Sequence, residues 1–241
     1  MKLIKEINFR LTTGAFDCYD RIRPYAIFDL FQEIAGIHAE EMNIGFQKLL
    51  SKDIIWVLAR NKYTIEHQIK VSSVVTVKTW PHPYGHFDCV RDYEIYDESG
   101  NLCVRGSSKW CLVNINSMKI VPMTNANVEG EHYEKNTYDE HFSKIEFDQK
   151  SKCEIVGKHI VQMSDLDHNG HMNNAKYAEL LCNVLELNEA QKIISVEMNY
   201  LKQLFLHDII TLKMIKKDHE TILIGEKDET CCFVCRCQWQ Q

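Results

Sequence analysis

The sequence predicts an α+β fold of two similar halves, each with a long helix wrapped by an antiparallel sheet. In each half a strand pattern leads into a polar loop. Apolar residues spaced three and four apart then follow, as in a helix that buries one face. Each helix is followed by segments rich in β-branched and aromatic residues, separated by turn residues, which is typical of antiparallel strands. Two such halves can join edge to edge in one sheet.

The first half is predicted to span residues 1–123. Its polar loop, residues 17–23, ends at Pro24, which stands where helices often begin. An apolar stripe with helical spacing follows, from Ile27 to Met42. Strands are expected over residues 5–12, 54–65, 74–80, 86–96, 102–115 and 119–122.

The second half is predicted to span residues 153–241, after a charged and polar linker over residues 124–152 that crosses the surface. Its helix is expected over residues 174–185. Asn173 or Asn174 is a suitable N-cap, because the side-chain oxygen can accept from a free backbone N–H of the first turn. Strands are expected over residues 154–163, 193–201, 208–216, 221–227 and 231–239.

The composition is that of an ordinary globular protein of 241 residues, with a net charge of −6 that gives no support for nucleic-acid binding. No apolar run is long enough to span a bilayer, and charges interrupt the N-terminal apolar pattern. We therefore expect no membrane insertion, no signal peptide and a cytoplasmic location. Most of the ten cysteines stand singly in strand patterns. The group Cys231, Cys232, Cys235 and Cys237 lacks zinc-site spacing, so we interpret the cysteines as reduced, small apolar residues.

The stretch from Ser164 to Leu181 concentrates the polar groups, since six of its first ten residues are Asp, His or Asn. One interpretation is a calcium loop, because Asp165, Asp167, Asn169 and Gly170 fit the first half of that pattern. Lys176 stands where the pattern requires a bidentate glutamate, and a strand precedes the loop instead of a helix, so we expect no metal.

Two further interpretations of this stretch remain open. Asp and Asn are frequent in turns, so His168 and His171 would then be surface residues of an ordinary loop. Alternatively, the loop is catalytic, because an acid, an amide and an imidazole precede a helix N-terminus that favours negative charge.

The run D-L-D-x-N-x-H-M-N-N-x-K-Y, residues 165–177, resembles the signature of the acyl-[acyl carrier protein] thioesterases. Four further blocks resemble that family in the same order, so the resemblance covers most of the chain. They are W-V-L-x-R at residues 56–60, T-W-P at 79–81, R-D-Y at 91–93 and S-S-K-W at 107–110.

The resemblance implies a tandem (double) hotdog fold and hydrolysis of the thioester of fatty acyl-[acyl carrier protein], which releases a free fatty acid and requires no cofactor. It also implies that Asp167, Asn169 and His171 are catalytic, without settling whether Asp167 or His171 is the base. Backbone N–H groups near Asn173 and Asn174, at the start of the helix, can stabilise the oxyanion.

One position departs from the family pattern. Gln203 stands where plant members carry a glutamate proposed to take part in catalysis, although a shifted alignment would bring in the nearby Glu197. The first loop, Asp17 to Tyr25, lacks the D-x-N-x-H-x-N-N pattern. One active site per chain is therefore expected, with the first half holding the substrate.

The acyl chain needs an apolar tunnel, and its carrier, the acyl carrier protein, needs a basic docking surface because it is acidic. The sequence leaves a homodimer open. Candidates for the tunnel wall are Ile27, Leu30, Phe31, Ile34, Trp56 and Leu58. Candidates for carrier docking are Arg21, Arg23, Lys176 and Lys202.

Other functions within the same fold are a hotdog dehydratase or hydratase, an acyl-CoA thioesterase and a non-catalytic acyl-binding protein. The dehydratases and hydratases carry a proline in their motif, and here Gly170 follows Asn169 and Met172 follows His171. The acyl-CoA thioesterase remains an alternative, because its chemistry is identical and only the carrier differs.

Overall fold

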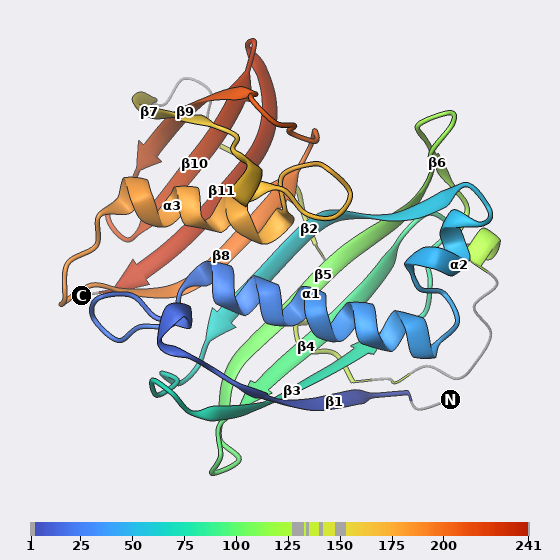
Figure 1. The fold of residues 1–241 in the computed structure, drawn as a ribbon. Helices are drawn as coiled ribbons and strands as arrows, with labels where there is room; N and C mark the ends of the chain where they lie inside the picture. Colours follow the sequence, from blue (N-terminus) through green and yellow to red (C-terminus); the bar gives the residue numbers. More distant parts are fainter. Residues whose placement is uncertain (1–2, 127–132, 134, 140–141, 148–152, 241) are drawn as a thin grey trace.

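The computed structural model describes residues 3–126, 133, 135–139, 142–147 and 153–240. Within these residues the strands form one 11-stranded sheet in which every pairing is antiparallel (Figure 1). The predicted antiparallel sheet is therefore confirmed. No helix among the described residues has the length and apolar character needed to cross a membrane.

The two halves of the sheet have the same strand order, reversed about its middle. The first half runs β1 (Lys5–Arg10), β3 (Val74–Pro81), β4 (Cys89–Tyr96), β5 (Leu102–Asn114) and β2 (Ile54–Ile65), with β6 (Lys119–Val121) beside β5. The second half continues with β8 (Lys192–Tyr200), β11 (Thr230–Gln240), β10 (Glu220–Lys227), β9 (Ile209–Lys216) and β7 (Glu154–Ile160).

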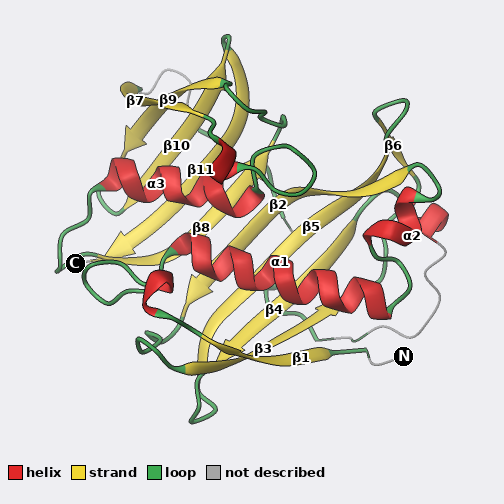
Figure 2. Cartoon of the chain, in the orientation of Figure 1, coloured by secondary structure: helices red, strands yellow, loops and turns green. Residues whose placement is uncertain are grey.

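Strands β2 and β8 join the halves. Their register runs from Arg60 opposite Asn199 to Thr64 opposite Ser195. Each half thus keeps its own run of consecutively paired strands, β3–β4–β5 or β9–β10–β11, and the pairing of β2 with β8 makes the sheet continuous through the middle of the molecule (Figure 2).

The helices lie on one face of this sheet (Figure 2). They are α1 (Pro24–Glu41), α2 (Phe46–Leu50) and α3 (Tyr177–Leu185), and α1 contacts α3. Helix α1 begins with Pro24 at its first turn, as predicted, and buries Ile27, Phe31 and Ile34 in the main core. The Phe31 ring stacks on Tyr93, with ring centres 4.2 Å apart. Gly106 of β5 permits this approach, because a Cβ there would lie 2.1 Å from the Phe31 ring.

The second helix is shorter than expected. The predicted helix over residues 174–185 begins with a 3-10 turn at Asn174–Lys176, and only Tyr177–Leu185, nine residues, is α-helical. The Asn173 side chain accepts from the N–H of Ala175, which caps the tighter turn and delays the α-helix. The expectation of two long helices is therefore wrong for the second half.

The described part of the predicted linker lies against the face of the sheet opposite the helices. Ile145 is buried with Ile222 and Ile224 of β10, whereas Leu223 between them faces the helices. Nearer the first half, the indole N–H of Trp80 donates to the carbonyl of Lys135 at 2.8 Å. The remainder of the linker, including residues 127–132 and 148–152, lies outside the described residues.

Candidate active site

The loop between β7 and α3 is a tight turn held by its own backbone. The N–H of Asp167 donates to the carbonyl of His171 at 3.0 Å, and the N–H of Gly170 donates to the carbonyl of Asp167 at 3.1 Å. Gly170 has φ +80°, in the left-handed region that favours glycine. The turn therefore brings the side chains of Asp167 and His171 together although they are four residues apart.

Two of the three predicted catalytic residues, Asn169 and His171, lie beside the carboxylate of the third, Asp167. The backbone N–H of Asn169 donates to Oδ1 at 2.8 Å, and the Asn169 amide nitrogen lies 3.4 Å from Oδ2. Nδ1 of His171 lies 3.6 Å from the same Oδ2, with 18% of the His171 side chain and 17% of the Asp167 side chain exposed. Since 3.6 Å exceeds a hydrogen bond, direct proton transfer requires a small closure or a bridging water.

A second acid–imidazole pair anchors this loop, and the sequence did not reveal it. Nε2 of His159, on β7, lies 2.8 Å from Oδ2 of the buried Asp165, which also accepts from the N–H of Gln162 at 2.9 Å. The carbonyl of Asp165 in turn accepts from the N–H of Asn173 at 2.8 Å. A single histidine in a strand pattern carries no signal of such a contact.

The start of α3 supplies fewer free backbone donors than predicted. The N–H of Met172 donates to the carbonyl of Leu204 at 2.8 Å, and the N–H of Asn173 is bound to Asp165. Among the described residues, the N–H of Asn174 has no such acceptor. The Asn173 side-chain oxygen also accepts from Nε2 of Gln32, on α1, at 3.1 Å. Of the two predicted oxyanion positions, Asn174 keeps a free N–H and Asn173 acts as the cap.

Gln203 lies in the segment that packs against the motif. Its neighbours Leu204 and Phe205 pair with Met172 and His171 through backbone contacts. The alternative candidate, Glu197, lies on β8 with Val196 and Met198, which face the helices, so its carboxylate points to the opposite face. Of the two candidates, Gln203 is therefore the one beside the catalytic loop, and its auxiliary role stays a prediction.

The candidate tunnel residues are core side chains. Ile27, Leu30, Phe31 and Ile34 lie in the main core, and Leu58 is buried. Trp56 packs in a smaller cluster with Met42 and Leu49, and its indole N–H donates to the carbonyl of Ile44 at 2.9 Å. His168, which the family pattern does not include, is exposed and packs edge-on against Phe46 of α2.

The four candidate docking cations differ in their surroundings. Arg21 is half-buried and forms an ion pair with Asp17 at 2.7 Å and hydrogen bonds to the carbonyls of Asn188 and Gln191. These contacts tie Arg21 to its own chain, and its docking role stays a prediction. Arg23 is exposed on the same loop. Lys176 pairs with Glu179 at 3.0 Å and lies over the Tyr25 ring, whereas Lys202 is exposed beside Gln203.

No group of three or more His, Cys, Asp or Glu side chains in the described part of the chain is placed to hold a metal ion. The ten cysteines are free thiols. Three cysteines of β11, Cys232, Cys235 and Cys237, are buried in the main core, where they pack as small apolar side chains.

Fold and loop together define a two-unit α+β protein with an acid, an amide and an imidazole at a helix start. The model of the acyl-ACP thioesterase N-terminal domain matches residues 3–130, and the model of the C-terminal domain matches residues 148–232. The chain belongs to the acyl-ACP thioesterase family.

Named relatives are similar over part of their length. An acyl-[acyl-carrier-protein] hydrolase of Cuphea viscosissima is 27% identical over 73% of this chain and 46% of the relative. A palmitoyl-acyl carrier protein thioesterase of Arabidopsis thaliana is 25% identical over 73% of this chain and 46% of the relative. The chain thus spans about half the length of the curated relatives it matches.

Solved structures share the fold. An acyl-ACP thioesterase from Bacteroides thetaiotaomicron has a TM-score of 0.89 at 20% identity and covers 98% of both chains. A 12:0-ACP thioesterase from Umbellularia californica has a TM-score of 0.88 at 19% identity, over 100% of this chain and 98% of that one. At these identities the likeness establishes the arrangement of helices and sheet.

Proposed function

We propose that this protein hydrolyses the thioester of fatty acyl-[acyl carrier protein], releases the free fatty acid and so ends chain elongation in fatty acid biosynthesis. The observation that carries the proposal is the convergence of Asn169 and His171 on Oδ2 of Asp167, in a loop within the family's C-terminal match. The names of the plant hydrolases support this substrate class.

The chemistry follows from the groups at hand. Water attacks the thioester carbon, and its proton passes to Asp167 or to His171 while the Asn169 amide holds the water or the carbonyl. The oxyanion accepts from the N–H of Asn174. When the C–S bond breaks, the thiolate of the carrier takes a proton, which leaves a fatty acid and a free thiol as products.

We also propose that the two halves are hotdog units with different roles. Each half places a helix, α1 or α3, against five strands of equivalent order, as in two hotdog units in tandem. We assign substrate holding to the first half and the acyl tunnel to the side chains beneath α1. The candidates are Ile27, Leu30, Phe31 and Ile34, together with Trp56 and Leu58 of β2.

Carrier docking is assigned to the surface beside the catalytic loop. Lys202 is exposed on the segment that pairs with the loop, and Lys176 ends the 3-10 turn directly before α3. A local basic surface is needed because the chain is net negative and the carrier is acidic. The cytoplasmic location stays a prediction, since the plant relatives are named chloroplastic. The homodimer also stays a prediction.

The test is release of free thiol from acyl carrier protein thioesters and from CoA thioesters over a range of chain lengths. We expect hydrolysis of both kinds, with the higher kcat/KM on the carrier-bound substrate. A preference for CoA thioesters would replace the proposed carrier and keep the chemistry. Tight binding of both substrates without any thiol release would reject hydrolysis in favour of an acyl-binding protein.

A further inference from the structure

The loop before α1 has the same backbone structure as the catalytic loop. Asp17 corresponds to Asp167 and Arg21 to His171, since each pair closes its loop by an N–H to carbonyl bond, at 2.9 Å and 3.0 Å respectively. The backbone N–H of Tyr19 donates to Oδ1 of Asp17 at 2.9 Å, as that of Asn169 does to Asp167. A 3-10 turn precedes both loops, and a bridge closes both, Phe16 with Ile22 and Leu166 with Met172.

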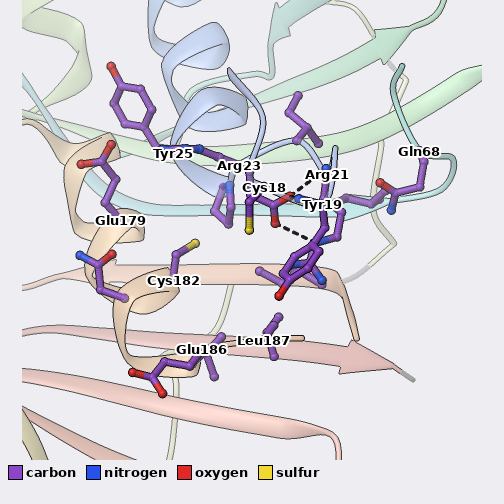
Figure 3. A pocket seen from close by; sticks show the side chains of 17 residues that line it. Cys18, Tyr19, Arg21, Arg23, Tyr25, Gln68, Glu179, Cys182, Glu186 and Leu187 are labelled. Atoms are coloured by element: carbon purple, nitrogen blue, oxygen red, sulfur yellow. Dashed lines mark hydrogen bonds and ion pairs between the residues drawn. The ribbon is translucent and has the colours of Figure 1, made fainter. Parts of the chain in front are cut away.

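A cavity of about 450 Å³ lies between this first loop and the C-terminal end of α3 (Figure 3). Small-molecule sites have volumes of about 300–1,000 Å³. The three catalytic candidates are not among the residues that line the cavity. Its apolar lining belongs to the main core or packs against it: Ile22, Ile65, Leu185, Leu187 and Ile193.

The polar lining leaves one cation available. The charge of Arg21 is paired with Asp17 through Nε, its Nη1 donates to two backbone carbonyls, and Glu179 is paired with Lys176. Arg23 is exposed and donates from Nε to the carbonyl of Phe16 at 2.7 Å, and it forms no ion pair within the described part of the chain. Its two terminal nitrogens are therefore free for an anion.

The remaining polar groups favour an anionic group of a ligand on the side of the cavity formed by the loop before α1. Glu186 lines the cavity at the end of α3, across from the loop, so an anion is favoured near Arg23 and disfavoured near Glu186 (Figure 3). Between these walls stands Cys182, and burial raises the pKa of its thiol to about 12. The thiol is thus neutral at physiological pH and extends the uncharged interior.

We propose that this cavity is a second, non-hydrolytic site that binds a fatty carboxylate. The carboxylate takes a bidentate pair from Arg23, and the alkyl chain lies among Ile22, Leu185 and Leu187. The choice of ligand rests on the proposed function, because that reaction releases a fatty acid. A bound acyl group is not hydrolysed here, because Arg21 takes the place of His171 and the loop has no imidazole to accept a proton.

The test uses the exposed thiol of Cys18, which lines the cavity, and the exposed thiol of Cys153, which does not. The rate of alkylation of each thiol by iodoacetamide is measured by mass spectrometry at increasing concentrations of dodecanoate. We expect saturable, several-fold slowing at Cys18 and no change at Cys153. Dodecanamide has the same alkyl chain as dodecanoate but no charge, so it should protect Cys18 only at much higher concentrations than dodecanoate.

Two substitutions address the two parts of the site. Arg23→Gln removes the cation and should raise the dodecanoate concentration for half-protection about tenfold. Arg10→Gln, an exposed arginine outside the cavity, is the matched control. Leu187→Trp fills the cavity and should abolish protection, and a thermal unfolding curve for each variant shows whether it folds.

Equal slowing at Cys18 and Cys153, or unchanged protection in a folded Arg23→Gln variant, would overturn the proposal. In the His171→Ala variant, dodecanoate should protect Cys18 as it does in the wild type, because the catalytic loop is separate from the cavity. Protection lost in His171→Ala would place the ligand at the catalytic site instead. A further outcome separates the two proposals. If dodecanoate protects Cys18 of the wild type but the protein releases no carrier or CoA thiol from acyl thioesters, the second site is supported and the proposed hydrolysis is rejected.

Discussion

The two loops that precede α1 and α3 share a backbone and differ in the side chain that faces the aspartate. In the first loop, Nε of Arg21 lies 2.7 Å from Asp17, and the same guanidinium binds two carbonyls of the segment after α3. In the second loop, Nδ1 of His171 lies 3.6 Å from Asp167. One loop uses the position to hold two halves together, and the other places an imidazole beside the aspartate. The comparison teaches that the scaffold sets the position and that the residue there decides between stability and chemistry.

The largest expected effect is on catalysis. Asp167→Asn, Asn169→Ala and His171→Ala should each lower kcat/KM for thioester hydrolysis by about a hundred- to ten-thousandfold, with folding retained. Steady-state kinetics on a carrier-bound substrate measures this. His168→Ala is the control, because His168 is exposed and contacts Phe46 only at a ring edge. Equal damage from His168→Ala and His171→Ala would show that the motif has been aligned in the wrong register.

The second effect concerns the stability of the first loop. Arg21→Ala removes the ion pair to Asp17 and the donor to the Gln191 carbonyl, whereas the Asn188 carbonyl keeps the N–H of Gln191. We expect a loss of about 2–3 kcal/mol in the free energy of unfolding, measured by denaturant titration. His171→Ala should cost under about 1 kcal/mol, because within the described residues the His171 ring makes no hydrogen bond of comparable length. If the two variants lose equal stability, the division of roles between the loops is wrong.

The stability that the ion pair between Asp17 and Arg21 contributes should depend on pH. Burial opposes ionisation of Asp17, but hydrogen bonds from Arg21 and from the N–H of Tyr19 outweigh it and lower the pKa of the carboxyl. A lowered pKa in the folded state contributes stability above about pH 4, and this is lost as the pH falls through the folded value. The stability advantage of the wild type over Arg21→Ala should therefore shrink below about pH 4. Unfolding curves at pH 7 and below pH 4 test this, and a constant difference would contradict it.

A smaller effect is expected where each loop meets the facing helix. Gln32 of α1 donates to Asn173 at the catalytic loop, whereas Cys182 of α3 faces the first loop with a neutral thiol. Gln32→Leu should lower kcat about tenfold and leave KM nearly unchanged, because Gln32 positions Asn173 and does not reach the substrate carbonyl. Cys182→Ser should leave kcat within about twofold. A rise in KM alone for Gln32→Leu would mean that Gln32 binds the acyl chain.

Much of the fold could be predicted from the sequence, because its signals are local. The expected strand at residues 54–65 is β2 with the same bounds, and Pro24 begins α1. The predicted strand at residues 154–163 ends early, at Ile160, because Asp165 folds back to accept from the N–H of Gln162. The sequence brought Asp167, Asn169 and His171 together because they lie within five residues.

Contacts between distant segments could not be predicted in this way. Arg21 reaches Asn188 and Gln191 in the other half, and His159 meets Asp165 across the end of a strand. Neither contact leaves a mark on residue spacing, so the sequence predicts neither the carbonyl partners of Arg21 nor the second acid–imidazole pair. The cavity beside the first loop depends on the same packing of α3 against that loop.

The smallest expected effect is on the apparent KM for the carrier-bound substrate, and it tests whether the carrier approaches the catalytic loop. Lys202 is exposed two residues before Leu204, whose carbonyl accepts from the N–H of Met172, so an acidic carrier that delivers its thioester to Asp167 passes close to Lys202. Lys202→Glu should raise the apparent KM for the carrier-bound substrate about three- to tenfold at low salt, and the difference should narrow as salt screens the charges. Lys119→Glu, which changes the same charge on the exposed strand β6, is the matched control and should have little effect. A short soluble thioester should respond far less than the carrier-bound substrate, because it needs no docking surface. If Lys202→Glu and Lys119→Glu raise the KM equally, only the net charge matters, and the carrier is not guided to the catalytic loop by Lys202.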